Sequence, residues 1–321
     1  MTYQTKSTTD QVALQKELPD TADVDSQQGA RTIVSGNPRH KTKVVGRRAL
    51  WYGVTLMICS VMMLPMLWMI TIALKSESAV FEIPPSFWPS EWNWGNFIEG
   101  PKLIKFPRLF ANTMIITVLT VFGGVMASMM AGYALARLRF RGSKTLFYVF
   151  VGSMLLPGVV GIIPLFQLFR DIGWYDTWLP LIVPAFLGGN PLFIFLARQY
   201  FLSVPYSLDE AAKVDGAGHF RVFFSIMLPI TRPAWIAMSI LAFQASWNDY
   251  LNPLIYLNSS EKWTLALGMS SFVSSFAAQA PDWSKYMATN LLYMLPPLLL
   301  FLFAQRYFIQ GLSSLGNTSQ K

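Results

Sequence analysis

Residues 207–217 read SLDEAAKVDGA, a short polar stretch that lies between two long apolar segments. Ser207 is a favoured N-cap residue and Glu210 follows three positions later, so the pair predicts a capping box at the start of a helix. Gly216 readily adopts the left-handed conformation in which many helices end. The stretch therefore predicts a short helix with a marked beginning and a marked end.

One face of this predicted helix carries mostly small side chains. Helical spacing places Leu208, Ala211, Ala212 and Asp215 on the same side. Small side chains allow another protein to approach the backbone closely. The helix by itself fits two roles equally well, a connecting element at the membrane surface and a docking element for a partner.

The composition is typical of a membrane protein with several spans. Of 321 residues, 53% are hydrophobic and 13% are charged, whereas soluble domains average about 25% charged residues. The net charge of +8 does not indicate nucleic-acid binding, because the basic residues are scattered at the ends of apolar runs. Cys59 is the single cysteine, which excludes an internal disulfide and a cluster of thiolate ligands.

Six apolar segments are long enough to cross a bilayer, so we predict an all-α membrane protein with six transmembrane helices. About 20 helical residues cross a hydrocarbon core of roughly 30 Å. The predicted spans are residues 49–74, 112–136, 146–169, 178–197, 228–247 and 287–304. The last five form a core at residues 108–308. Residues 1–48 are polar and aperiodic and predict a disordered tail that is not a signal peptide, and residues 309–321 form a second tail.

Lys and Arg predict how the chain is oriented. With a cytoplasmic amino terminus, 18 of the 25 Lys and Arg residues lie on the inside, as the positive-inside rule requires. Both termini and residues 207–217 are then cytoplasmic. Aromatic residues at the predicted outer edges fit a membrane-interface belt better than a binding site; they are Trp88, Trp92, Trp94, Trp174, Tyr175 and Trp178.

The sequence lacks the common catalytic motifs. It contains no G-x-x-x-x-G-K-[ST] phosphate loop, and therefore cannot bind ATP in the P-loop manner, and it has no HExxH, CxxC or G-x-S-x-G. The two histidines, His40 and His219, fall in the tail and in a loop, which disfavours a His-based metal site. We predict a subunit that is not an enzyme and binds no cofactor, metal or nucleic acid of its own.

The spacing around the polar helix resembles the EAA motif of ATP-binding-cassette importer permeases. Glu210-Ala211-Ala212 is followed after three residues by Gly216, and after nine more by Ile226-Met227-Leu228-Pro229. Other stretches are similar to the maltose-type sugar permeases, in particular to their smaller membrane subunit; they are residues 163–169 (IPLFQLF), 189–191 (GNP), 195–201 (FLARQYF), 247–249 (WND) and 305–308 (QRYF). The similarity covers roughly residues 50–312. The polar amino-terminal tail and residues 311–316, which lack the usual glycine-rich closing run, depart from it.

The resemblance implies the type I importer permease fold, with a coupling helix at about residues 207–216 that docks on a separate ATPase. It assigns this contact to Glu210, Ala211, Ala212, Asp215, Gly216 and Ala217. It also implies a second, different permease subunit, two ATPase subunits that bind ATP and Mg, an extracytoplasmic solute-binding protein and a surrounding lipid membrane, the bacterial cytoplasmic membrane. The implied activity is carbohydrate import by alternating access.

Three amide side chains at apparent membrane depth are our candidates for the sugar passage: Asn190, Gln244 and Asn248. Residues 75–110 and 248–285 are the outer segments expected to meet the binding protein. Two alternatives remain open. An importer of the same class for an amino acid, peptide or phosphate is disfavoured by the sugar-permease stretches. An ion-coupled carrier or channel is disfavoured because the predicted spans contain no Asp or Glu.

Overall fold

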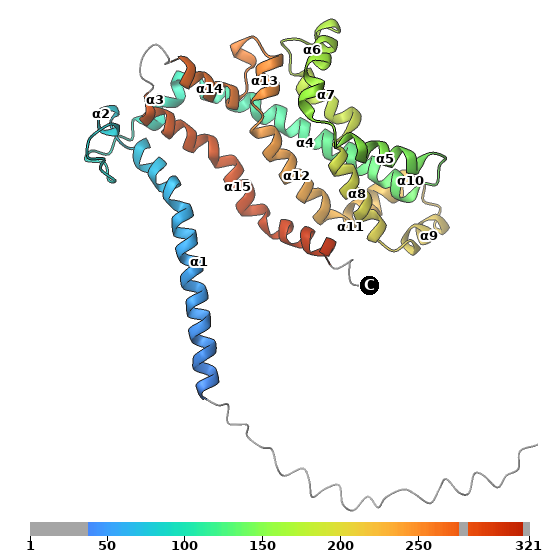
Figure 1. Ribbon diagram of the computed structural model, residues 1–321. Coiled ribbons are helices and arrows are strands. Elements are labelled where there is room, and N and C mark those ends of the chain that lie inside the picture. Colours follow the sequence, from blue (N-terminus) through green and yellow to red (C-terminus); the bar gives the residue numbers. More distant parts are fainter. Residues whose placement is uncertain (1–37, 276–281, 317–321) are drawn as a thin grey trace, which may run out of the picture. The chain divides into compact units, whose positions relative to one another are not determined.

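The computed structural model describes residues 38–275 and 282–316, and within them every regular element is helical, which confirms the predicted all-α class. The chain divides into two compact units, Met1–Met63 and Leu64–Lys321. Helix α1 (Pro38–Ala73) runs across the boundary between them (Figure 1). In the first unit the apolar side chains of α1 that the structure describes are exposed, as expected for a helix surrounded by lipid or by another subunit.

The remaining helices belong to the second unit. They are α2 (Glu77–Val80), α3 (Asn96–Leu103), α4 (Phe106–Arg137), α5 (Ser143–Ser153), α6 (Ile162–Asp171), α7 (Leu179–Gly188), α8 (Pro191–Ser203), α9 (Ser207–Val214), α10 (His219–Val222), α11 (Leu228–Ile230), α12 (Arg232–Trp247), α13 (Leu251–Tyr256), α14 (Leu265–Ser275) and α15 (Trp283–Gly316). A π-helix, η3 (Phe223–Met227), joins α10 to α11, and two 3₁₀ turns are η2 (Gly158–Gly161) and η4 (Ser260–Lys262).

Each predicted span has a counterpart. Four segments of the described chain are long and apolar enough to cross a membrane: Leu50–Ala73, Phe106–Arg137, Leu179–Ser203 and Trp283–Gln305. Two bent helix pairs raise the number to six if each pair is one span, with bends of 97° between α5 and α6 and 80° between α10–α11 and α12. Two of the six predicted spans are therefore broken helices.

The fifth predicted span, residues 228–247, needs correction. Helix α11 ends at Ile230 and α12 begins at Arg232, with Pro233 in its first turn. Proline has no N–H for the preceding turn to bind, so it starts a helix more easily than it continues one. The chain bends at this point, and Arg232 begins a helix instead of lying inside one.

Both predicted tails also need correction. Residues 38–48, assigned to the amino-terminal tail, are the first part of α1, and α15 continues through residues 309–316 of the predicted carboxyl-terminal tail. Extending an existing helix costs far less than starting one, so polar residues join a long apolar helix. Residues 1–37, with the disorder predicted for them, and residues 317–321 lie outside the described residues.

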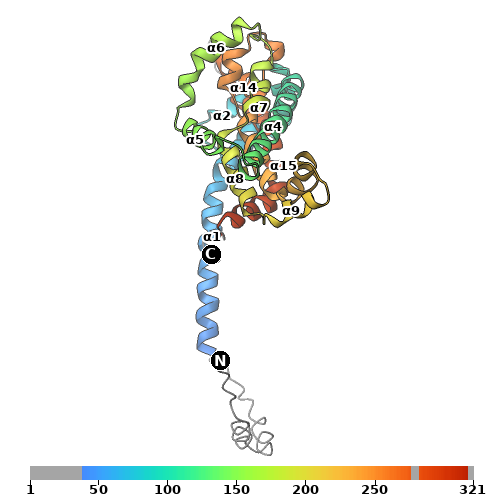
Figure 2. The ribbon, with the colours of Figure 1, turned by 90° about the vertical axis from the view of Figure 1, so that its right-hand side faces the viewer.

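The core of the second unit forms around α4, which packs against α7, α8 and α12. The crossing of α4 and α8 is close, because a Cβ on Gly132 would lie 2.6 Å from the Ala197 Cβ. Met129, Phe201 and Met227 are fully buried beside this crossing. In both views α9 lies at the opposite end of this unit from α6 and α14 (Figures 1 and 2).

Candidate functional site

The short helix α9 begins differently from the prediction. No capping box forms, because Tyr206 with φ −69° is the N-cap, and Ser207 is already the first helical residue. The N–H groups of Asp209 and Glu210 donate to the Tyr206 carbonyl at 3.0 and 3.2 Å. A serine inside the first turn lies beyond the position from which its hydroxyl could cap the helix. The preceding backbone turn therefore starts α9 without a side-chain cap.

The end of α9 is as predicted. Gly216 has φ +77°, the left-handed conformation that glycine adopts without steric cost. The Ala217 N–H donates to the Ala212 carbonyl at 2.9 Å, and the Gly216 N–H donates to Lys213 at 3.0 Å. This is the Schellman arrangement, which pairs carbonyls that the helix leaves free. The helix ends sharply, and the chain turns toward α10.

A buried ion pair fixes α9 to α4. Arg137 is the last residue of α4, and its NH1 lies 3.0 Å from Oδ2 of Asp209, with side chains only 5% and 4% exposed. The NH2 of Arg137 also donates to the carbonyls of Phe201 and Val204, at 2.6 Å each. We call Arg137, Asp209 and these two carbonyls the Arg137 cluster. One guanidinium thus joins the ends of α4, α8 and α9.

The Arg137 cluster was not predicted from the sequence. Asp209 lies in the first turn of α9, whereas its partner Arg137 ends the span α4, which is distant in the sequence. Burial raises the pKa of Asp209, and the neighbouring Arg137 opposes that rise. A buried charge is tolerated when it is paired, as Asp209 is with Arg137, and the Arg137 guanidinium is hydrogen-bonded to two carbonyls as well.

The residues of the EAA motif, Glu210 to Ala217, do not all face the same way. Ala212 is 5% exposed and packs in the core with Tyr133, Phe201 and Phe223. The accessible residues are Glu210, Ala211, Lys213, Val214, Asp215 and Gly216, while Ala217 is half-buried. The small-residue face is therefore divided, with Ala212 turned toward the core and Ala211 and Asp215 left open to a partner.

A cleft of about 470 Å³ lies among α4, α7, α12 and α13. Small residues make room for it; they are Gly124, Ala185, Gly189, Ala242 and Ala245. Its polar lining consists of Thr120, Asn190, Ser246, Asp249, Asn252 and Thr264. Concave spaces of this size with a few polar groups are the usual form of small-molecule sites.

Asn190 lies in this cleft at the break between α7 and α8. Its Oδ1 accepts the Leu192 N–H at 2.9 Å and so caps α8, while its own N–H donates to Ser128 Oγ at 3.0 Å. Gly189 has φ +60° and ψ −166°, and a Cβ there would lie 2.5 Å from the same Oγ. The break predicted from Gly-Asn-Pro therefore depends on glycine.

Gln244 and Asn248 do not line this cleft. They contact each other, since Asn248 Nδ2 donates to the carbonyl of Gln244 at 2.9 Å and to its Oε1 at 3.2 Å. The hydroxyl of Tyr293 on α15 donates to Asn248 Oδ1 at 2.8 Å. The structure thus brings Gln244 and Asn248 together, whereas Asn190, the third predicted passage residue, lies among the residues that line the cleft.

The residues that sequence reasoning missed are Ser246, Asp249 and Asn252. Positions 242, 245 and 246 follow the helical repeat on the face of α12 that lines the cleft, and position 249, just beyond the end of α12, lines the same cleft. The same spacing shows that 244 and 248 belong to another face. This helical spacing can be read from the sequence, but using it requires knowledge of which face of α12 lines the cleft.

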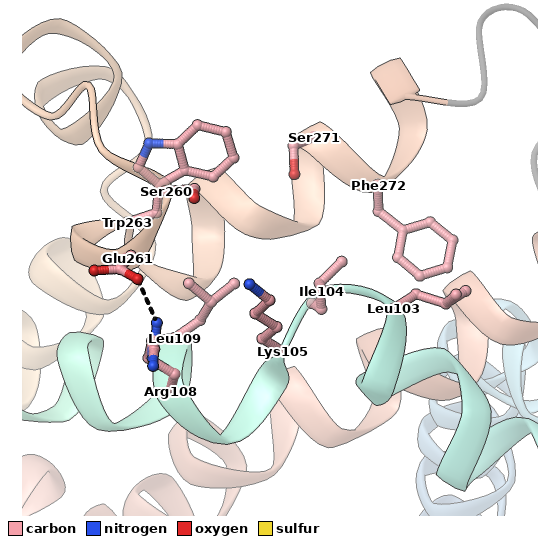
Figure 3. A pocket seen from close by; sticks show the side chains of 10 residues that line it. All are labelled: Leu103, Ile104, Lys105, Arg108, Leu109, Ser260, Glu261, Trp263, Ser271 and Phe272. Carbon is pink, nitrogen blue, oxygen red and sulfur yellow. Dashed lines mark hydrogen bonds and ion pairs between the residues drawn. The ribbon is translucent and has the colours of Figure 1, made fainter.

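A second pocket, of about 260 Å³, lies where the start of α4 meets the loop before α14 (Figure 3). Arg108 NH1 lies 3.2 Å from Glu261 Oε1, and the two side chains are 51% and 75% exposed. Asn112 Nδ2 donates to the carbonyls of Glu261 and Trp263 at 2.8 and 2.9 Å. This pocket falls within the two segments predicted to meet a binding protein. Among the described residues, no group of three His, Cys, Asp or Glu side chains could hold a metal ion.

Broken apolar helices around a polar cleft, with a short surface helix joined to the core, define the class of membrane permeases. The chain belongs to the family of binding-protein-dependent transport system inner membrane components, whose model matches residues 120–314. It is a multi-pass inner-membrane protein and a non-catalytic permease subunit of an ABC transporter, which confirms the predicted family.

Individual relatives agree with this assignment. The chain is 31% identical to the probable ABC transporter permease protein YurM of Bacillus subtilis, over 88% of this chain and 91% of that protein. It is 30% identical to the diacetylchitobiose uptake system permease protein NgcG of Streptomyces coelicolor, over 77% and 81%. It is also 30% identical to the sn-glycerol-3-phosphate transport system permease protein UgpE of Pectobacterium atrosepticum, over 75% and 86%.

A solved structure shows the same fold. A chain of a bacterial ABC transporter involved in the import of the acidic polysaccharide alginate superimposes with a TM-score of 0.71, at 22% identity. The match covers 84% of this chain and 98% of that one. The importer permease fold expected from the sequence is thereby confirmed.

Proposed function

We propose that this chain is the permease subunit of an importer that moves a carbohydrate across the bacterial cytoplasmic membrane by alternating access. A separate ATPase drives the change through α9. The partners are a second permease, two ATPase subunits that bind ATP and Mg, and an extracytoplasmic solute-binding protein. The distribution of Lys and Arg supports the orientation, with both termini and α9 in the cytoplasm.

The Arg137 cluster is the observation that carries this proposal. A docking helix transmits force only if it is fixed to the helices that must move, and Arg137 fixes α9 to the ends of α4 and α8. Driving a two-state passage from 1:99 to 99:1 requires about 5.5 kcal/mol. Removing one partner of a buried ion pair costs about 3–5 kcal/mol, because the other charge is left unpaired. The junction therefore depends on both Arg137 and Asp209.

Exposed residues of α9 provide the surface for the ATPase. Glu210, Ala211 and Asp215 are accessible, and Ala211 gives a small patch between two acidic side chains. Gly216 ends the helix sharply, which leaves this surface unobstructed. Ala212 contributes indirectly, because it packs α9 onto the core.

The variant Ala211→Trp tests the coupling role. Because Ala211 is exposed, a bulky side chain there leaves the fold intact and blocks close docking. We expect co-purification of the ATPase and solute uptake to fall at least about tenfold, as for a tightly packed interface residue. Leu155→Trp, at a position that is 85% exposed and far along the chain from α9, is the matched control and should change neither. Full ATPase association with Ala211→Trp would remove α9 from the interface.

Carbohydrate is the solute class best supported. The relative NgcG is named for diacetylchitobiose, and other relatives are named for arabinooligosaccharides. The cleft offers hydroxyl, amide and carboxylate groups, which suit sugar hydroxyls. The relative UgpE favours a second candidate, a phosphorylated polyol. Uptake of diacetylchitobiose against sn-glycerol 3-phosphate by vesicles containing the assembled transporter decides between the two.

A further inference from the structure

We propose that Asp249 is a specificity-determining residue that makes the cleft select uncharged or cationic sugars and reject anionic solutes. The inference rests on the proposed function for the statement that the solute is a sugar. It adds a statement about which charge of solute the cleft accepts, which we call the charge rule and which neither the family nor its named relatives provide. Relatives carry names that include a phosphorylated solute as well as sugars, so the family alone leaves the charge of the solute open.

The lining of the cleft contains one charged residue. Asp249 lies just beyond the last turn of α12, and the other residues of the lining are neutral; the polar ones among them are Thr120, Asn190, Ser246, Asn252 and Thr264. Among the described residues that line the cleft there is no Lys, Arg or His. Within the described part of the chain, Asp249 also forms no ion pair. Its negative charge therefore acts on whatever enters the cleft.

The carboxylate is also held in place. Asp249 Oδ1 accepts the Asn252 N–H at 3.2 Å, and Oδ2 accepts Asn252 Nδ2 at 2.9 Å. A carboxylate has about four acceptor positions, so these two bonds leave capacity for hydroxyl donors. Hydrogen bonds from a sugar hydroxyl to a carboxylate are charge-assisted and short.

A fixed charge inside a concave, largely apolar wall has a strong effect on solutes. Such walls focus the electric field and change the local concentration of ions of either sign. A phosphate or uronate in this cleft meets a like charge and finds no basic partner, whereas a neutral sugar gains an acceptor. Repulsion of the wrong solute is an effective way to obtain specificity.

Asp249 also has a structural role that an experiment must separate from this one. Its bonds to Asn252 hold the first turn of α13 (Leu251–Tyr256). Asp249→Asn keeps a side-chain oxygen that accepts the Asn252 N–H, and it removes the charge together with the second acceptor, which Asn252 Nδ2 uses. Asp249→Glu keeps the charge and changes the reach of the side chain. The two variants together distinguish an electric role from a capping role.

The experiment measures the field in the cleft with two thiol reagents of opposite charge. Cys59 is replaced by alanine, and Ala245→Cys introduces a thiol at an exposed position of the lining. Two methanethiosulfonate reagents are then applied to permeabilised membranes containing the full transporter. One carries a cationic trimethylammonium group and the other an anionic sulfonate group. The ratio of the two labelling rates reports the local potential. Leu155→Cys, outside the cleft, is the control position.

We expect Asp249→Asn to lower the cation-to-anion ratio at Ala245→Cys by about tenfold at low ionic strength, and Asp249→Glu to preserve it. The ratio at Leu155→Cys should not change with either variant. An unchanged ratio in Asp249→Asn overturns the proposal, and so does a thiol at position 245 that neither reagent reaches. Uptake of diacetylchitobiose is measured separately: if the ratio shifts and no carbohydrate is imported, the charge rule stands and the proposed function fails.

Discussion

At each end of α4 one side chain donates hydrogen bonds to two backbone carbonyls of a neighbouring segment, but the two side chains differ in chemistry. At the carboxyl-terminal end Arg137 donates to two carbonyls of the chain that ends α8, and at the amino-terminal end Asn112 donates to two carbonyls of the loop before α14. The two ends differ in the charge of the donating side chain and in the burial of the nearby ion pair. Arg137 is paired with the buried Asp209, whereas the ion pair beside Asn112, Arg108 with Glu261, is exposed.

The comparison indicates which end of α4 is rigid. A buried, hydrogen-bonded ion pair cannot lose one partner without leaving a charge in the core, so that junction stays intact during function. The exposed ion pair of Arg108 with Glu261 exchanges with water at little cost, and the hydrogen bonds of Asn112, although that residue is buried, leave no charge behind when they break. We therefore expect α4, α8 and α9 to move together, while the contacts of the loop before α14 adjust.

The largest effect is expected from breaking the charged end with Arg137→Met. This change leaves Asp209 as an unpaired buried charge and frees the carbonyls of Phe201 and Val204. We expect a loss of about 3–5 kcal/mol in the free energy of unfolding, measured by equilibrium unfolding in mixed detergent micelles. Asp209→Asn should cost less, because Arg137 keeps both carbonyls and an amide oxygen remains nearby.

The double variant Arg137→Met with Asp209→Leu provides the control for charge. Removing both charges should recover part of the loss, but not all of it, since the two carbonyls remain without their donor. A double variant as unstable as Arg137→Met would show that the carbonyls, and not the charge, dominate this junction. A cost below about 1 kcal/mol for Arg137→Met would contradict the comparison itself.

The neutral end is tested by Asn112→Ala. Two hydrogen bonds to carbonyls are lost, and we expect a cost of roughly 1–3 kcal/mol in the same unfolding measurement. Asn290→Ala is the matched control, because the side-chain nitrogen of Asn290 makes only a 3.8 Å contact with the Met69 sulfur. It should cost less than Asn112→Ala. Equal costs would mean that the carbonyl contacts of Asn112 contribute little.

Much of the fold was predictable because it depends on local signals. Apolar length predicted the four long spans, and the two bent helix pairs correspond to the other two if each pair is one span. Gly216 predicted the end of α9, since this feature is determined by neighbouring residues. The bend before Arg232 also has a local cause in Pro233. The capping box failed for a local reason as well, because the turn at Tyr206 already places Ser207 inside the helix.

The parts that could not be predicted depend on distant contacts. Helical spacing groups Ala211 with Ala212, but it does not say that Ala212 faces the core while Ala211 is exposed. The pairing of Asp209 with Arg137 joins α9 to the end of α4, two elements that a single sequence does not place side by side. Asn190 lies at the break between α7 and α8, and its neighbours in the cleft depend on how α12 is rotated.

The loop before α14 also depends on Asp176, whose behaviour with pH can be measured. Hydrogen bonds from Ser259, the largest cause, together with those from Asn258 and Lys262, lower the pKa of the Asp176 carboxyl well below its usual range. A carboxyl with a lowered pKa in the folded state contributes stability above its unfolded pKa of about 3.9. This contribution is lost only as the pH falls through the lower, folded pKa.

We therefore expect Asp176→Asn to lose about 1 kcal/mol at pH 7, with the deficit shrinking below about pH 4. The loss is modest because Lys262 is 43% exposed. Amide hydrogen exchange at Ser259, compared between pH 4 and pH 7, checks the sign. A deficit that grows toward acid pH would mean that Asp176 is stabilised in its protonated form.

The smallest effect is expected from Arg108→Ala. The ion pair of Arg108 with Glu261 is exposed on both sides, and such pairs contribute about 0.2–1 kcal/mol. Arg170→Ala is the control, since Arg170 makes an equally exposed pair with its neighbour Asp171. Both deficits should shrink in 1 M salt, where the Debye length is about 3 Å. The opposite result would be that Arg108→Ala costs more than Asn112→Ala and that its cost does not fall in salt. The amino-terminal end of α4 is then held by charge, as the other end is, and the loop before α14 moves together with α4.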